Sequence, residues 1–354
     1  MDGKKTLRPR DVRLDLIRTV AVALVVSVHF FFNGGYYDLP MEGPGMLAMT
    51  VLRMAFMICV PLFLLLTGYL CRNKVLSGRY YLGLVRILLT YGLCALVCLE
   101  ARQAMGEELG WKGVLRGLLD FSGAPYGWYV EMYIGLFLLI PFLNVLWKGL
   151  AERGQRKALI ATLAVMTFLP ALANARFPLL PDWWMGTLYP LTYYFLGAYF
   201  GEYEPRLSWR WGVPALLAAS LAGAGLAFWL SRGGTFVWYP VLDTFGPTVA
   251  LSACLAFLML LRVPADRAPG WLKWLLRKCS ELSLGAYLLS WCFDKAFYPI
   301  LTARVDTMNA RMVWFVVIVP AVLLASTLAS QVIEWVRKAI TWAINKLCPK
   351  ANLR

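Results

Sequence analysis

Apolar stretches of helical length recur along the whole chain and leave room for little besides membrane helices. Of the 354 residues, 60% are apolar and 16% are charged, and the mean hydropathy of +0.62 is outside the range of soluble domains. About ten stretches are long enough to span a bilayer. They cover residues 14–33, 46–70, 80–99, 129–148, 157–173, 187–202, 212–230, 244–262, 281–299 and 312–334. The sequence therefore predicts an all-α, polytopic membrane bundle.

The net charge of +15 is explained by membrane topology and needs no nucleic-acid partner. If the N-terminus is cytoplasmic, most of the 35 lysines and arginines fall in segments that face the cytoplasm, as the positive-inside rule requires. Both termini are then cytoplasmic and the protein crosses the cell membrane many times. Residues 1–13 are predicted to form a cytoplasmic tail, 14–334 the transmembrane domain and 335–354 a basic cytoplasmic segment.

The chain has one histidine, His29, and it lies within the first apolar stretch. Arg18 precedes it by eleven residues, so the two lie roughly 20° apart around a helix and about 16 Å apart along it. Asp15 is three residues before Arg18 and is predicted to pair with it. A titratable group in hydrocarbon usually faces the protein interior or a water-filled cavity, which makes His29 a functional candidate. The alternative is an interior histidine that only bonds a neighbouring helix.

Arginines also gather at the cytoplasmic side of the third stretch. Arg79 and Arg86 are seven residues apart and share a helix face about 10 Å long. With Arg18 they could hold phosphate groups, since guanidinium groups bind phosphate oxygens through paired hydrogen bonds. Arg79 could equally anchor the helix at the lipid headgroups.

A second polar group is predicted near the depth of His29, on the outer side. A carboxylate bonded to the imidazole would orient it as a general base, and Glu131 is the candidate. A structural ion pair between Arg53 and Glu131 is the competing interpretation. The residues predicted at this outer side, for acceptor binding or at helix ends, are Arg53, Asn33, Trp128, Asp294 and Lys295.

Other features carry less weight. The eight cysteines are scattered, and Cys94 and Cys98 are interpreted as small apolar fillers. With one imidazole available, no metal site is predicted. The connection 100–127 could be a lid, part of an acceptor site or a covering loop. Segments 263–279 and 336–348 are typical of helices that lie on the inner leaflet.

Several motifs, in order along nearly the whole chain, resemble the acyltransferase-3 family of membrane acyltransferases. Arg18 and His29 match its Arg-x10-His signature. The other matching stretches are PLFLLLTGY at 61–69, YYLGLVRIL at 80–88, WYVEMY at 128–133 and ELSLGAYL at 281–288. Two departures stand out. Gly83 replaces the first arginine of the family's Arg-x-x-Arg segment, so only Arg86 carries over. Ser290 stands where many relatives have a second histidine.

The resemblance implies transfer of an acyl group, usually from acetyl-CoA, to a hydroxyl of a cell-envelope carbohydrate. No permanently bound cofactor is implied. Arg18, Arg79 and Arg86 would bind the CoA phosphates, and His29 would act as general base or carry the acyl group. The alternative from another class is a transporter or binding protein for a small polar solute, and a third is a sensing module without catalysis.

Overall fold

The computed structural model describes residues 10–174 and 176–347, and within them it contains helices, turns and no strand. The predicted all-α fold is therefore confirmed. The α-helices are α1 (Val12–Asn33), α2 (Gly43–Phe56), α3 (Cys59–Cys71), α4 (Gly78–Ala104), α5 (Trp111–Leu119), α6 (Trp128–Gly149), α7 (Arg153–Ala173), α8 (Asp182–Tyr203), α9 (Trp209–Ser231), α10 (Pro247–Leu260), α11 (Gly270–Arg304), α12 (Met308–Arg311) and α13 (Phe315–Leu347). The short 3-10 turns are η1 (Tyr36–Asp38), η2 (Pro240–Leu242), η3 (Ala265–Arg267) and η4 (Met312–Trp314).

Eight helical segments of the described chain are long and apolar enough to cross a membrane. One of them, Gly43–Cys71, consists of α2 and α3, which are separated by a break at Met57 and Ile58. The two other predicted spans coincide with α8 and α11. These are helices of 22 and 35 residues, but α8 is rich in tyrosine and α11 carries Asp294 and Lys295 in its predicted span. The count of about ten spans stays a prediction.

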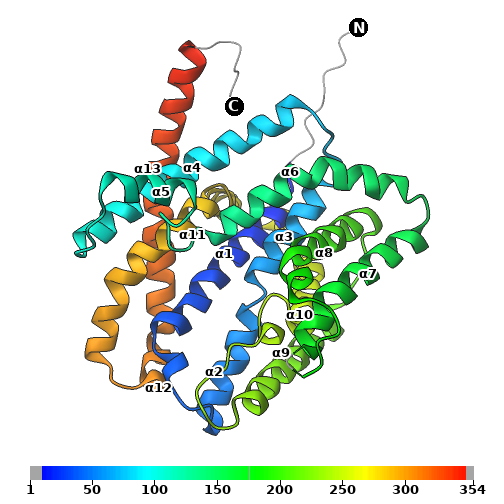
Figure 1. The fold of residues 1–354 in the computed structure, drawn as a ribbon, viewed down its shortest axis with the longest axis horizontal. Coiled ribbons are helices and arrows are strands. Elements are labelled where there is room, and N and C mark those ends of the chain that lie inside the picture. The colour runs from blue at the N-terminus through cyan, green and yellow to red at the C-terminus, as the bar shows by residue number, and fades with distance from the viewer. Residues whose placement is uncertain (1–9, 175, 348–354) are drawn as a thin grey trace.

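Helix α1 lies at the centre of the bundle. It packs against α2, α3, α10, α11 and α13. In Figure 1 it lies between α11 and α13 on one side and α3 on the other. Ile17, Phe30 and Phe31 on α1 are fully buried. Burying both ends of α1 among long helices fixes the positions of the side chains that it presents to the interior.

Two glycines in the family-like motifs mark places where helices approach closely. A Cβ on Gly68 of α3 would collide with the backbone of Tyr194 on α8. A Cβ on Gly285 of α11 would collide with Ser330 on α13, whose hydroxyl donates a 2.9 Å hydrogen bond to the carbonyl of Leu282. Small residues at such crossings let membrane helices pack backbone against backbone. Both motif glycines thus have a packing reason.

The two predicted surface helices are, for the most part, parts of longer helices. Residues 270–279 are the first turns of α11, and 336–347 continue α13 without a break. The last turns of α13 project beyond the rest of the bundle (Figure 1). The polar stretches that precede the apolar run of α11 and follow that of α13 are helical as well. Hydropathy alone therefore predicts both helices to be shorter than they are. Residues 1–9 of the predicted tail and 348–354 of the predicted basic segment lie outside the described residues.

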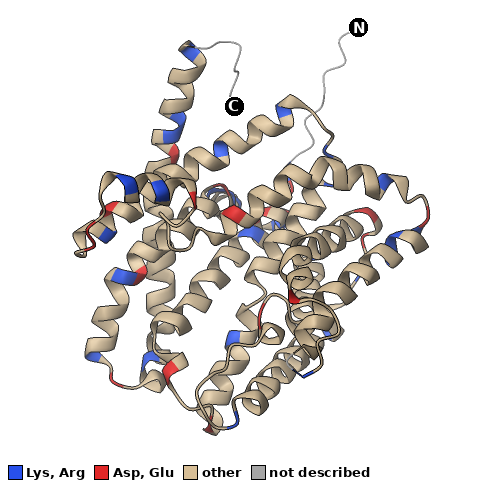
Figure 2. Ribbon diagram, viewed as in Figure 1, with Lys and Arg blue, Asp and Glu red and all other residues tan. Residues whose placement is uncertain are grey.

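Charged residues are distributed as expected of a membrane bundle. Figure 2 shows their positions on the ribbon mainly toward helix ends and connections, with long uncharged stretches of helix between. The thiols of Cys94 and Cys98 are fully buried and free, and Cys98 Sγ lies 3.7 Å from Cys292 Sγ. Within residues 10–174 and 176–347, no group of three or more histidine, cysteine or acidic side chains could hold a metal ion.

Candidate active site

The histidine faces a buried carboxylate. Nδ1 of His29 on α1 lies 3.6 Å from Oδ2 of Asp294 on α11. Asp294 is fully buried and accepts a 2.8 Å hydrogen bond from the Tyr126 hydroxyl. Among the described residues, neither His29 Nδ1 nor Asp294 Oδ1 has a hydrogen-bond partner. The carboxylate is therefore free to accept a hydrogen bond from a protonated Nδ1 after a small movement, which would orient the ring and select its tautomer.

Tyr126 connects the groups around this pair. Its ring centroid lies 3.9 Å from that of His29. The side-chain amide of Asn33 donates to the backbone carbonyl of His29 at 2.9 Å and lies 3.5 Å from the Tyr126 hydroxyl. The hydroxyl of Tyr287 donates to the backbone carbonyl of Tyr126. The imidazole is thus enclosed by an aromatic ring and by side chains from α1 and α11.

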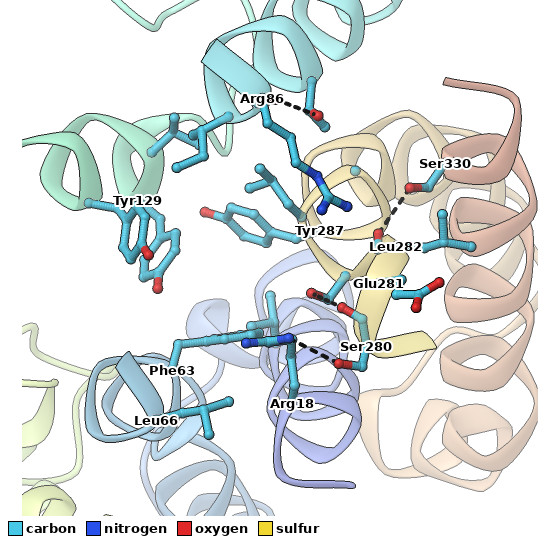
Figure 3. Close-up of a pocket in the computed structure, with 18 of the residues that line it drawn as sticks. Arg18, Phe63, Leu66, Arg86, Tyr129, Ser280, Glu281, Leu282, Tyr287 and Ser330 are labelled. Carbon is cyan, nitrogen blue, oxygen red and sulfur yellow. Dashed lines mark hydrogen bonds between the residues drawn. The ribbon is translucent and has the colours of Figure 1, made fainter. Parts of the chain in front are cut away.

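A cavity of about 340 Å³ opens between α1, α3, α4, α6, α11 and α13. Figure 3 shows Arg18 and Arg86 entering it from opposite sides, from α1 and α4, with Tyr129 and Tyr287 placed between them. Arg18 Nη1 donates a 3.1 Å hydrogen bond to Ser280 Oγ. Two cations on opposite walls suit a ligand that carries several negative charges.

The cavity ends one aromatic layer away from the histidine. Val25, which shares a helix face with Arg18 and His29, lines the cavity on α1. Tyr287 also lines it, and the rings of Tyr287 and Tyr126 stack with centroids 6.3 Å apart. The Tyr126 ring in turn contacts the imidazole of His29 at a tilt of 35°. The face of α1 that Arg18 and His29 share therefore runs from the cavity to the His29–Asp294 pair.

Two carboxylates at the cavity hold arginines in place. Glu281 Oε1 lies 2.9 Å from Arg10 Nη1 and 2.8 Å from Arg277 Nε. Glu334 accepts two hydrogen bonds from Arg337, at 2.7 and 2.8 Å, and its Oε1 lies 3.9 Å from Arg86 Nη2. Ion pairs of this kind position the guanidinium groups, and a bound anion can then replace the carboxylate as their partner. Sequence reasoning missed Arg10, Glu281 and Glu334, because they resemble ordinary charges at helix ends.

The family model for acyltransferase 3, described as an acyltransferase domain, matches residues 11–331. The chain belongs to the acyltransferase-3 family. No curated protein and no solved structure matches it. The match covers nearly all of the sequence, includes Arg18, His29, Arg86 and Asp294, and identifies the protein as a membrane acyltransferase.

The structure gives His29 a different partner from the one the sequence suggested. Glu131 is exposed on α6, and Asp294 is the carboxylate beside the imidazole. The reason lies in helix geometry. Tyr129 lies two residues before Glu131 and Tyr133 two residues after it, and both line the cavity. A step of two residues is about 200° around a helix, so Glu131 points away from the cavity. Asp294 was expected at a helix end, but α11 continues to Arg304 and carries Asp294 inside the bundle.

Arg53 does not pair with Glu131. It is fully buried and donates to the Tyr37 hydroxyl at 2.9 Å and to the carbonyl of Leu242 at 3.3 Å. Its guanidinium carbon lies 4.4 Å from the ring centroid of Phe236. These contacts tie α2 to the connections after α1 and α9, so the acceptor-binding role expected of Arg53 has no support in its surroundings.

The remaining candidates are divided between the site and its surroundings. Asp15 pairs with Arg10 at 2.6 Å, because Arg10 can reach both carboxylate oxygens, and Arg18 bonds Ser280 instead. Arg79 is exposed and is not among the residues that line the cavity. Trp128 is half exposed at the start of α6, where its ring contacts Tyr129 edge to face. Asn33 is part of the histidine site, as described above.

Proposed function

We propose that this membrane acyltransferase transfers an acyl group, with acetyl the favoured one, from cytoplasmic acyl-CoA to a hydroxyl of an envelope or extracellular carbohydrate. The observation that carries the proposal is the cavity between Arg18 and Arg86, which ends one tyrosine layer from the His29–Asp294 pair. Such a site can hold phosphates at one end and a reacting thioester at the other. An opening on both sides of the bundle would let donor and acceptor meet at the imidazole.

The donor end is supported by its charges. Arg18, Arg86 and Arg10 all line the cavity, and each is positioned by a hydroxyl or carboxylate partner. The diphosphate and 3′-phosphate of CoA are multiply charged anions, and arginine binds them through paired hydrogen bonds. The tyrosine-lined remainder of the cavity suits the uncharged pantetheine arm.

The reaction end follows from the imidazole and its carboxylate. With the proton on Nδ1 directed at Asp294, the lone pair of Nε2 is available. As a general base, Nε2 takes the proton of the acceptor hydroxyl while the oxygen attacks the thioester carbonyl. The C–S bond then breaks, and the imidazolium returns its proton to the CoA thiolate. Alternatively, Nε2 itself attacks the carbonyl, and the C–S bond breaks to release the CoA thiolate. The acceptor hydroxyl then attacks the acyl-imidazole, the acyl–nitrogen bond breaks, and the hydroxyl proton passes to the thiolate, which leaves the imidazole neutral.

Binding of CoA tests the donor half and separates the proposal from a solute transporter, which should ignore CoA. We expect CoA to raise the melting temperature of the purified protein in a saturable manner. Because the Arg86 side chain is 50% exposed, solvent screens its contacts, and Arg86→Gln should raise the Kd for CoA about 3- to 10-fold. Arg79→Gln is the matched control and should change the Kd less than about twofold. Unchanged binding in Arg86→Gln would place the phosphates elsewhere.

The proposed topology has about ten spans with both termini in the cytoplasm. It is supported by the bias of basic residues toward one side. Single cysteines introduced near residue 340 should react with a membrane-impermeant maleimide only after the cells are permeabilised, whereas cysteines introduced at 107–112 should react in intact cells. A cysteine-depleted background and a cytoplasmic marker protein provide the controls. Labelling near residue 340 in intact cells would contradict the topology and the placement of the donor.

A further inference from the structure

A second cavity lies away from the site described above. It has a volume of about 390 Å³ and is formed where α3 and α6 end, at α7 near its start, and near the end of α8. Arg72, Lys148 and Arg156 line it together with Trp147 and Glu202. It shares no lining residue with the donor cavity. On α6, Tyr133 of the donor cavity and Trp147 of this one are fourteen residues apart, or about 21 Å along the helix.

Buried hydrogen bonds build the walls of this cavity. The side-chain amide of Asn144 donates to the carbonyls of Cys71 and Lys74 at 2.8 and 2.7 Å, which fixes the turn that carries Arg72. The Tyr194 hydroxyl donates to Asn144 Oδ1 at 2.6 Å and ties the same turn to α8. Trp147 Nε1 donates to Glu202 Oε2 at 2.7 Å. The cavity is therefore a fixed part of the fold and does not depend on a loose surface loop.

The side chains that line the cavity have a net positive charge, because three basic residues face one carboxylate. Arg156 pairs with Glu202 and donates to the Tyr203 hydroxyl at 2.9 Å, but its Nε is buried and has no hydrogen-bond partner among the described residues. In the described parts of the chain, neither Arg72 nor Lys148 forms an ion pair. Three cations surround one carboxylate, so positive charge remains for a further anion. Phosphate oxygens could accept hydrogen bonds from these cations.

Apolar side chains are exposed on α6 close to the cavity. Val145 lies three residues before the lining residue Lys148 and therefore on the same side of α6; it is 70% exposed, and the neighbouring Leu146 is 47% exposed. In a membrane bundle such exposed apolar side chains face lipid tails. Basic pockets between membrane helices on the cytoplasmic side are typical sites for phospholipid headgroups. A free phosphate compound would use the cations but gain nothing from the neighbouring apolar face.

We infer that this cavity binds the phosphate group of an anionic phospholipid in the leaflet on the side where the basic residues predict the cytoplasm. Arg72, Lys148 and Arg156 contact the headgroup, and the acyl chains lie along the face that Val145 and Leu146 expose. The site is separate from the proposed transfer of an acyl group and would be present even if that proposal failed.

Thermal unfolding of the purified full chain in detergent tests this inference. The probes are short-chain phosphatidylglycerol, phosphatidylcholine with the same chains, inorganic phosphate and CoA. We expect phosphatidylglycerol to raise the melting temperature at lower concentration than phosphatidylcholine. Lys148→Gln and Arg72→Gln should each raise about fivefold the phosphatidylglycerol concentration that gives half of the maximal rise in melting temperature. Arg206→Gln, an exposed arginine predicted on the same side, is the matched control and should respond as the wild type does. Lys148 is exposed, so its variant is expected to fold.

The probes also separate the sources of phosphate. If inorganic phosphate displaces phosphatidylglycerol and stabilises the protein as strongly by itself, the site binds phosphate but the assignment to lipid is wrong. If Lys148→Gln abolishes stabilisation by CoA, the cavity belongs to the donor site and the inference is overturned. Equal responses to the two lipids, unaffected by either variant, would overturn it as well. Stabilisation by CoA that persists in both variants supports two separate sites.

Discussion

Replacing His29 with alanine is expected to lower kcat at least about 100-fold while the protein still folds and binds CoA. In the proposed reaction the imidazole takes up the acceptor proton and returns it to the CoA thiolate, and a positioned general base contributes roughly 10²- to 10⁴-fold. In the proposed site CoA contacts the arginines at the other end of the cavity, so its Kd should change less than about twofold. Acyl transfer from labelled acetyl-CoA and thermal titration with CoA, on the same preparation, measure both.

The His29→Gln variant controls for the space that alanine leaves beside the Tyr126 ring. Its amide keeps a polar group next to Asp294 but is a poor base, so it should be as inactive as His29→Ala and melt closer to the wild type. If either variant retains more than a few per cent of the wild-type kcat, His29 neither serves as the base nor carries the acyl group. Loss of CoA binding along with activity would instead indicate a structural role.

Replacing Asp294 with asparagine is expected to lower kcat by roughly 10² or more, with little change in the Kd for CoA. Asparagine keeps the size of the side chain and can still accept the hydrogen bond from Tyr126. It lacks the charge that orients the imidazole and stabilises its protonated form. In a catalytic triad the same change from carboxylate to amide lowers kcat about 10⁴-fold, so about 10² is the lower bound of the loss expected here. Steady-state kinetics with CoA binding on the same sample separates kcat from donor affinity.

Glu131 provides the matched control for the Asp294 variant. Glu131→Gln makes the same chemical change at the residue that sequence reasoning favoured, and its exposed position on α6 leads us to expect less than about a twofold change. The double variant of His29→Ala with Asp294→Asn should be no worse than His29→Ala alone, because groups that act as one unit are not additive. If Glu131→Gln lowers kcat as much as Asp294→Asn, the assignment of the carboxylate is wrong.

Much of the fold was predictable because the bilayer imposes lengths on helices. Apolar runs located α1, α4, α6 and most of the other long helices to within a few residues. The periodicity of one helix also placed Arg18 and His29 on a common face. What hydropathy cannot give is where a helix ends once its sequence becomes polar, and α11 and α13 both extend well beyond their apolar cores.

The partner of His29 was not predictable from membrane depth alone. Depth selected Glu131, but depth says nothing of rotation about the helix axis. The spacing of Tyr129 and Tyr133 could have shown that Glu131 points away from a shared face. Asp294 follows Tyr287 by seven residues and therefore shares its face. Yet the contact between α1 and α11 joins residues 265 positions apart along the chain, and a single sequence carries no signal for it.

Transfer of a labelled acetyl group tests the central claim most directly. The purified wild type, His29→Ala and Asp294→Asn proteins would each be incubated with acetyl-CoA labelled in the acetyl group and an envelope-glycan extract from cells that produce the protein. We predict that label enters the glycan fraction with the wild type, that it stays at background with His29→Ala although this variant still binds CoA, and that mild alkali releases it, as expected of an O-ester. Equal incorporation by His29→Ala and the wild type would contradict the account.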